Sequence, residues 1–306
     1  MNQSMGLKEL GSTQVLLPEI GLGTWNYHGG PEVLRRGLEE GALFIDTAES
    51  YGTESVVGEA VRELRDQVFI ATKVSPQHFR YHDVIRSANA SLHKLGIDCI
   101  DLYQLHEPSD AIAIEETMGA MAELVDSGKV RFIGVSNFSI QQLEKAQKAL
   151  PKYPIVSNQV RYSVIDRTIE AGLLQYCQAH HITVIAYSPL GREFNRIRDC
   201  DPSGVINQIA ATTAKTPAQV VLNWILSKPG IVAIPKSNST NRIIENCGAS
   251  GWRLSSGQLA ILDSRIQYRR RNRFDQLVRQ CVPGPLHSLA IKTLNAMPLG
   301  LRRRFQ

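Results

Sequence analysis

Four side chains that can donate, accept or stabilise a proton stand close to the ends of three apolar segments. Asp46 and Tyr51 follow one segment, while Lys73 and His106 end the next two. A phenol titrates with a pKa of about 10, and a neighbouring ammonium lowers that pKa by stabilising the phenolate. A carboxylate can hold the ammonium in place, and a histidine N–H can orient a carbonyl oxygen. The set is therefore suited to protonating an alkoxide that forms when hydride adds to a carbonyl.

Each of the four residues also has a purely structural interpretation. An aspartate after apolar residues often caps the next helix, and a lysine at a strand end often extends its ammonium to solvent. A histidine there is often an ordinary core or loop residue. The combination favours catalysis, because independent polar residues seldom fall on three successive strand ends by accident.

The segments that carry these residues belong to a series of eight short apolar runs with helical patterns between them. Near-continuous apolar runs are typical of parallel strands that are covered on both faces. Eight strand–helix alternations in about 250 residues predict an α/β protein of the (β/α)8 TIM barrel class, with the strand ends meeting at one mouth. The eight runs are 19–25, 42–48, 68–74, 99–106, 130–137, 155–162, 183–190 and 232–237.

The helical intervals carry recognisable end signals. Gly96 follows an amphipathic stretch and predicts a helix end, Ser139 with Gln142 forms a capping box, and Thr216-Pro217 predicts a helix start. An open nucleotide-binding sheet is the main structural alternative, but it needs a GxGxxG motif after the first strand. The glycines of the GLGTWN segment lack the third member of that motif, so any nucleotide must be held in another way.

Two segments lie outside the repeating strand–helix pattern. Residues 7–10 and 15–17 predict an N-terminal β-hairpin that could plug the bottom of the barrel. Residues 265–306 contain nine arginines, one lysine and one acid, a net charge of +9, which leaves −4 for the rest of the chain. We therefore expect a barrel over residues 1–266. We expect residues 267–306, here called the basic tail, to be a C-terminal extension that packs on or near the barrel.

As a set, eight short motifs resemble those of the aldo-keto reductases, in register over residues 7–266. The resemblance implies that Asp46, Tyr51, Lys73 and His106 form a catalytic tetrad with Tyr51 as general acid. It also implies that NADPH/NADP⁺ binds in an extended pose across the barrel mouth, without a Rossmann fold. The motifs are GLGTW (21–25), FIDTAESYG (44–52), ATK (71–73), LYQLH (102–106), GVSNF (134–138), NQVRY (158–162), YSPLG (187–191) and IPKS (234–237).

The same resemblance implies which residues hold the cofactor. Ser136, Asn137 and Gln159 would hold the nicotinamide carboxamide, and Tyr187 would stack on the ring. The 2′-phosphate would be bound by Lys236, Ser237 and Arg242, and a lysine and an arginine near a helix start are chemically suited to this. These two cations could instead be a solvated loop pair, and Asn137 and Gln159 could be ordinary polar residues at strand ends. The implied cofactor residues are Gly23, Thr24, Trp25, Asp46, Ser136, Asn137, Gln159, Tyr187, Ser188, Pro189, Leu190, Gly191, Ile234, Pro235, Lys236, Ser237, Arg242, Glu245 and Asn246.

The residues around the expected substrate pocket depart from the better-known members of that family. Trp25, together with Tyr51 and His106, is expected to line the pocket, and Tyr27 is either a further pocket aromatic or a packing residue. Glu107 follows the histidine where a tryptophan is often found, so the pocket wall is expected to be more polar. The C-terminal segment is rich in arginine where the family often has an aromatic-lined loop. The identity of the carbonyl substrate therefore stays open.

The composition excludes several other kinds of protein. Five cysteines without a CxxC pair argue for reduced thiols, a cytoplasmic location and no metal site. No run approaches the roughly 18 apolar residues of a membrane helix, and the N-terminus lacks a secretory signal pattern. Nucleic-acid binding is not expected, because the chain without its basic tail is mildly acidic. The tail itself is compatible with contact to an anionic membrane or acidic partner, or simply with packing and solvation.

The function predicted from these residues is NADPH-dependent reduction of an aldehyde or ketone, with a small carbonyl compound as the partner molecule. One alternative is a regulatory, redox-sensing subunit that binds NADP(H) with little turnover. Another is a binding protein that acts through its basic tail. The intact tetrad argues against the regulatory subunit. The second alternative is distinguished by whether removal of residues 267–306 abolishes association with a partner or membrane and spares turnover. The oligomeric state is not predicted.

Overall fold

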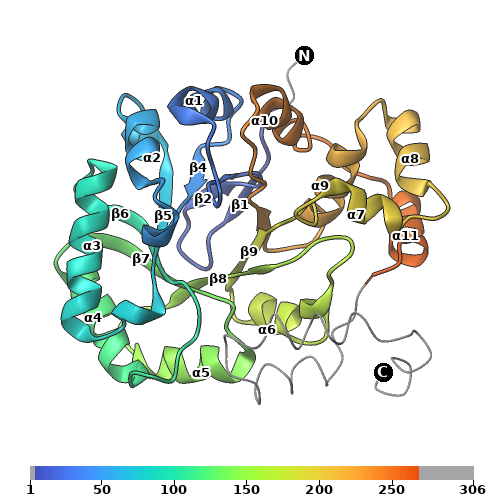
Figure 1. Ribbon diagram of the computed structural model, residues 1–306. Coiled ribbons are helices and arrows are strands. Elements are labelled where there is room, and N and C mark those ends of the chain that lie inside the picture. Colours follow the sequence, from blue (N-terminus) through green and yellow to red (C-terminus); the bar gives the residue numbers. More distant parts are fainter. Residues whose placement is uncertain (1–3, 269–306) are drawn as a thin grey trace, which may run out of the picture.

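The computed structural model describes residues 4–268 and contains the predicted barrel, with eight parallel strands in the order β10-β9-β8-β7-β6-β5-β4-β3 (Figure 1). The sheet closes on itself through a parallel bridge between Ile20 and Ala233. The Gly21 N–H donates to the Ala233 carbonyl at 2.8 Å, and the Ala233 N–H donates to the Glu19 carbonyl at 2.9 Å. The strands are β3 (Leu22–Gly23), β4 (Phe44–Asp46), β5 (Phe69–Val74), β6 (Ile100–Leu105), β7 (Val130–Ser136), β8 (Ile155–Arg161), β9 (Thr183–Tyr187) and β10 (Ile231–Ala233).

Helices surround the strands and begin and end at the predicted signals. Ser139 and Thr216 each form a capping box, and Gly96 ends its helix in the left-handed region with φ 66°. The helices are α1 (Gly30–Glu39), α2 (Glu54–Val61), α3 (Tyr81–Leu95), α4 (Ile114–Asp126), α5 (Ile140–Ala149), α6 (Leu173–Ala179), α7 (Phe194–Asp199), α8 (Val205–Thr213), α9 (Pro217–Leu226), α10 (Thr240–Cys247) and α11 (Ser256–Arg265), with short 3₁₀ turns η1 (Glu49–Tyr51), η2 (Arg65–Gln67), η3 (Pro76–His78) and η4 (Thr168–Glu170).

All of the strands except β5 end earlier than their apolar runs predict, and the backbone after β7 and β9 shows the reason. β7 stops at Ser136 and β9 stops at Tyr187. The residues that follow, Asn137 and Ser188, have φ angles of 63° and 49°, which are incompatible with an extended strand. These left-handed residues turn the backbone at the barrel mouth, where the predicted site lies.

The predicted N-terminal hairpin closes the opposite end of the barrel. It consists of β1 (Leu7–Glu9) and β2 (Leu16–Pro18), paired antiparallel. Leu10 and Leu17 are fully buried in the barrel interior among inward-pointing residues such as Phe44. The Thr183 hydroxyl, at the first residue of β9, donates to the Glu9 carbonyl at 3.0 Å. Because apolar side chains fill this lower half, polar chemistry is confined to the mouth at the strands' carboxyl ends.

Two further expectations concern membrane-spanning helices and the basic tail. No helix between residues 4 and 268 is long and apolar enough to cross a membrane. The basic tail lies almost wholly outside the described residues, so its packing and the domain boundary before it stay predictions.

Candidate active site

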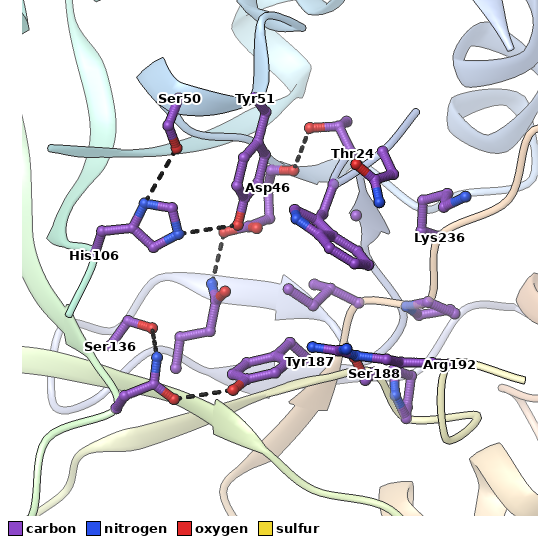
Figure 2. Close-up of a pocket in the computed structure, with 18 of the residues that line it drawn as sticks. Thr24, Asp46, Ser50, Tyr51, His106, Ser136, Tyr187, Ser188, Arg192 and Lys236 are labelled. Carbon is purple, nitrogen blue, oxygen red and sulfur yellow. Dashed lines mark hydrogen bonds between the residues drawn. The ribbon is translucent and has the colours of Figure 1, made fainter. Parts of the chain in front are cut away.

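A pocket of about 440 Å³ opens at the carboxyl ends of the strands (Figure 2). It gathers sixteen of the predicted site residues from the carboxyl ends of β3, β4, β7, β8 and β9 and from the loops that follow β3, β4, β6, β7, β9 and β10. The lining residues are Gly23, Thr24, Trp25, Asn26, Asp46, Ser50, Tyr51, His106, Glu107, Ser136, Asn137, Gln159, Tyr187, Ser188, Pro189, Leu190, Arg192, Ile234, Pro235 and Lys236.

A buried ion pair lies beneath the pocket. The Lys73 ammonium, which is fully buried, contacts Asp46 Oδ2 at 2.6 Å and donates a second hydrogen bond to the Thr47 carbonyl at 2.8 Å. Burial lowers the pKa of Lys73, and the adjacent Asp46 carboxylate opposes that effect. Neighbouring strands β4 and β5 bring the two residues together, as predicted. Lys73 itself does not line the pocket but supports its floor.

The second carboxylate oxygen of Asp46 is held by two glutamine amides. Gln159 Nε2 donates to Asp46 Oδ1 at 2.6 Å, and Gln104 Nε2 donates to the same atom at 3.3 Å. Sequence reasoning assigned Gln159 only to the cofactor and missed Gln104. The signal was present, because Gln104 lies two residues before His106 in the same predicted strand run, a spacing that places both on one face. With these amides and Lys73, both oxygens of the buried carboxylate are satisfied.

Tyr51 and His106 face each other at the edge of the pocket, as the dashed line in Figure 2 shows. The Tyr51 hydroxyl lies 3.2 Å from His106 Nε2, and the Lys73 ammonium lies 5.0 Å from the centre of the Tyr51 ring. Tyr51 ends the turn η1, after which Gly52 reverses the chain with φ 69°. Since the two polar atoms are within hydrogen-bonding distance of each other, one carbonyl oxygen can contact both.

The expected lowering of the Tyr51 pKa is wrong for this state of the protein. Burial raises that pKa, and the Asp46 carboxylate raises it further. The physical reason is that the Lys73 ammonium bonds to Asp46 and to a backbone carbonyl, and not to the phenol. Tyr51 is therefore a fully protonated phenol at neutral pH, which suits a proton donor.

His106 is neutral at physiological pH. Burial lowers its pKa to about 4, and the nearby Lys73 ammonium contributes to the shift. Its other ring nitrogen, Nδ1, lies 3.5 Å from the Ser50 hydroxyl. A neutral imidazole that carries its proton on Nε2 can donate a hydrogen bond toward the pocket.

The lowered pKa of His106 predicts a specific pH dependence. Between pH 4 and about 6.5 the unfolded chain binds a proton that the folded chain does not, so the free energy of unfolding should fall as the pH is lowered through this window. At the site, kcat/KM for a carbonyl substrate should show no inflection near pH 6.5. Both expectations depend on the pKa of His106. An NMR titration of the His106 ring, with its signals assigned by comparison with His106→Asn, measures that pKa. Titration near 6.5 would contradict the neutral-histidine interpretation.

A polar chain crosses the other side of the pocket. Tyr187 donates to Asn137 Oδ1 at 3.1 Å, and Asn137 Nδ2 donates to the Ser136 hydroxyl at 3.1 Å. In Figure 2 the Tyr187 ring stands across the pocket from Tyr51 and His106. Three polar groups and one aromatic ring thus share a wall, as the sequence predicts for a nicotinamide site.

Some predicted site residues lie away from the pocket lining. Arg242 is exposed on α10, and the Ser237 hydroxyl bonds to the backbone of Ser239. Tyr27 is buried and donates to the Gly30 carbonyl at 2.6 Å. Of the two alternatives for Tyr27, a pocket aromatic or a packing residue, it is therefore the packing residue. The predicted residues outside the lining are Lys73, Gly191, Ser237, Arg242, Glu245 and Asn246.

Four lining residues were not predicted as site residues: Asn26, Ser50, Glu107 and Arg192. The guanidinium of Arg192 lies 5.2 Å from the centre of the Trp25 ring, and no described acid pairs with it. Glu107 was recognised only as a departure from the family pattern. A strand-end pattern identifies residues that point inward, but it does not reveal which loop side chains bend back over the mouth.

A (β/α)8 barrel with a protonated phenol and a neutral imidazole above a buried ion pair defines a barrel enzyme of the acid–base class. The comparison with known families is more specific. The sequence model described as the Aldo/keto reductase family matches residues 19–267, and the chain belongs to this family.

Relatives and solved structures agree with this assignment. The chain is 38% identical over 263 residues to methylglyoxal reductase YeaE of Escherichia coli, covering 82% of this chain and 92% of that protein. It is 34% identical to a glyoxal reductase of Bacillus subtilis, covering 82% and 89%. Its structure is similar to an aldo/keto reductase from Klebsiella pneumoniae crystallised with NADP and acetate, with TM-score 0.78, 38% identity, and coverage of 87% and 96%.

Proposed function

We propose that the protein is an NADPH-dependent carbonyl reductase in which Tyr51 is the general acid. One observation carries this proposal: the Tyr51 hydroxyl and His106 Nε2 lie 3.2 Å apart above the buried Asp46–Lys73 pair. The family membership and the NADP complexes of similar proteins support the cofactor. The direct test is NADPH consumption with a panel of small aldehydes and ketones.

The residues present fit the cofactor chemically. Asn137 donates one amide proton to Ser136, which leaves a second amide proton and the Ser136 hydroxyl proton for a carboxamide. The Tyr187 ring offers an aromatic face, and the exposed Lys236 lines the far side of the pocket without a described acidic partner. Arg192, also without an acid, adds positive charge suited to a diphosphate.

The mechanism follows from the positions of the four residues. NADPH, when bound, supplies a hydride to the carbonyl carbon. Tyr51 gives its phenolic proton to the carbonyl oxygen, which becomes the alcohol oxygen. His106 donates a hydrogen bond to the same oxygen and stabilises its developing charge. The Lys73 ammonium, fixed 5.0 Å from the Tyr51 ring, stabilises the phenolate that remains after proton transfer.

A raised pKa does not prevent Tyr51 from acting as an acid. An alkoxide is a stronger base than a phenolate, so proton transfer from Tyr51 to the reduced oxygen is downhill. The burial that raises the pKa also keeps the proton on Tyr51 until hydride has been delivered. Tyr51 therefore keeps its phenolic proton at all pH values near neutrality.

We propose small dicarbonyl compounds as the substrate class. The similarity to proteins named methylglyoxal reductase and glyoxal reductase supports this choice. The polar wall residue Glu107 and the polar Asn26 also suit a small oxygenated molecule better than a large apolar one. The cytoplasmic location and the contacts of the basic tail stay predictions.

Cofactor preference provides a prediction about Arg242. Because a charged hydrogen bond contributes about 1.5–3 kcal/mol, NADPH should bind at least about tenfold more tightly than NADH. Arg242→Ala should remove most of this preference by weakening NADPH alone. The measurement is fluorescence titration with both cofactors, and Arg62→Ala, which changes an exposed arginine just after the end of α2, is the matched control. Equal affinities in the unaltered protein would contradict the assignment of Lys236 and Arg242 to the 2′-phosphate.

A further inference from the structure

A buried polar layer lies beneath the pocket and is not used by the mechanism above. Gln104 and Ser157 are fully buried, and neither Gln104 Oε1 nor the Ser157 hydroxyl has a hydrogen-bond partner among the described residues. Gln104 on β6 pairs in register with Gly134 on β7, which pairs with Ser157 on β8. The three residues therefore occupy one level of the barrel interior.

Gly134 makes the space for this layer. A Cβ atom at position 134 would lie 2.4 Å from the Ser157 hydroxyl and 3.1 Å from Gln104 Cγ. Any larger residue at position 134 would displace the Gln104 side chain from its present position. The glycine thus allows the Gln104 amide to reach Asp46, and this contact is the only hydrogen bond of that side chain among the residues described.

The two amides that hold Asp46 Oδ1 differ in their surroundings. Gln159 lines the pocket and lies 2.6 Å from Asp46 Oδ1, whereas Gln104 is sealed below the pocket and lies 3.3 Å away. An ionised carboxylate oxygen without a donor is costly inside a protein. If Gln159 turns its amide toward a ligand, Gln104 is the one remaining donor to Asp46 Oδ1 in the part of the chain that the structure describes.

We propose that Gln104 is a positioning residue that holds Asp46 while Gln159 is recruited by the nicotinamide carboxamide. The inference rests on the proposed function, since it needs NADPH as the ligand. It makes the affinity for NADPH depend on a side chain that does not touch the cofactor. Without Gln104, recruitment of Gln159 leaves Asp46 Oδ1 unpaired, and the cost appears as weaker binding. Asp46 also loses its fixed orientation toward Lys73, which slows proton donation from Tyr51.

The test uses Gln104→Met, which keeps the length and volume of the side chain but removes its amide. Protein fluorescence titration should show NADPH binding about tenfold more weakly, as expected for one lost hydrogen bond to a charged group. A fragment that lacks nicotinamide, 2′-phospho-ADP-ribose, should bind with unchanged affinity, because it does not recruit Gln159. Ser157→Ala, a change in the same buried layer, is the matched control and should leave both affinities unchanged.

A double variant tests whether the effect of Gln104→Met on NADPH affinity depends on Gln159. In a Gln159→Met background, Gln104→Met should no longer change the affinity for NADPH, because there is no amide to recruit. Should Gln104→Met fold poorly, Gln104→Asn withdraws the amide by one methylene in a still polar layer and should show the same pattern.

Two outcomes overturn the inference while the proposed function stands. One is an equal loss of affinity for NADPH and for the fragment in the Gln104 variants, which would indicate general damage to the barrel. The other is no loss for either ligand. By contrast, an unaltered protein that neither binds NADPH nor consumes it would refute the proposed function itself.

Discussion

Tyr51→Phe should lower kcat for carbonyl reduction by about 10²–10⁴-fold, the usual contribution of general acid catalysis. The substitution removes the hydroxyl 3.2 Å from His106 Nε2 and leaves the volume of the side chain almost unchanged. His106 cannot replace it as the acid, because its pKa of about 4 leaves it neutral at working pH. NADPH affinity should hardly change, since the phenol acts on the substrate.

The measurement is single-turnover reduction of an activated aldehyde, together with NADPH titration by protein fluorescence. Tyr103→Phe is a matched control, because the Tyr103 hydroxyl is also buried, has no hydrogen-bond partner between residues 4 and 268, and lies outside the pocket. It should retain nearly full activity. Retention of more than about a tenth of kcat by Tyr51→Phe would contradict its role as proton donor.

Lys73→Met should damage both stability and catalysis. The variant leaves the Asp46 carboxylate buried without its counter-charge, which typically costs about 3–5 kcal/mol in the free energy of unfolding. It also removes the positive charge 5.0 Å from the Tyr51 ring, so the phenolate that forms on proton transfer is no longer stabilised. We therefore expect a loss of kcat comparable to that of Tyr51→Phe.

The two effects of Lys73→Met can be separated with a second substitution. Adding Asp46→Asn removes the uncompensated charge, so denaturant unfolding should show that much of the lost stability returns. Activity should stay low, because the ammonium is still absent. Recovery of activity in the double variant would contradict the role of Lys73 in proton transfer and leave it a structural residue.

The barrel and the tetrad could be predicted because both depend on regular features of the sequence. Apolar runs at regular spacing specify parallel strands, and polar residues that end those runs must meet at one mouth. For this reason Asp46, Lys73 and His106 lie where the sequence places them. The N-terminal hairpin was also predictable, and its Leu10 and Leu17 are buried at the open end of the barrel.

Other features depend on distances that no pattern encodes. Burial, and then the Asp46 carboxylate, raises the Tyr51 pKa, and Lys73 does not offset the rise because its ammonium bonds to Asp46 and not to the phenol, a matter of side-chain geometry. The spacing of Gln104 from His106 indicates that it points inward, but only the structure shows that its amide lies beside Asp46. Arg192 reaches the pocket only because its loop, with φ 70° at Arg192 itself, turns the side chain toward Trp25.

The central claim, that this chain reduces carbonyl compounds with hydride from NADPH, is tested most directly by isotope transfer. The protein is incubated with methylglyoxal or glyoxal and with NADPH deuterated at both C4 positions of the nicotinamide, and the alcohol product is analysed by mass spectrometry. The account predicts one deuterium on the new carbinol carbon for each NADPH consumed, and about 10²–10⁴-fold slower formation of this product by the Tyr51→Phe variant. Tight NADPH binding without deuterated alcohol from any carbonyl in the panel would contradict it and favour a redox-sensing subunit instead.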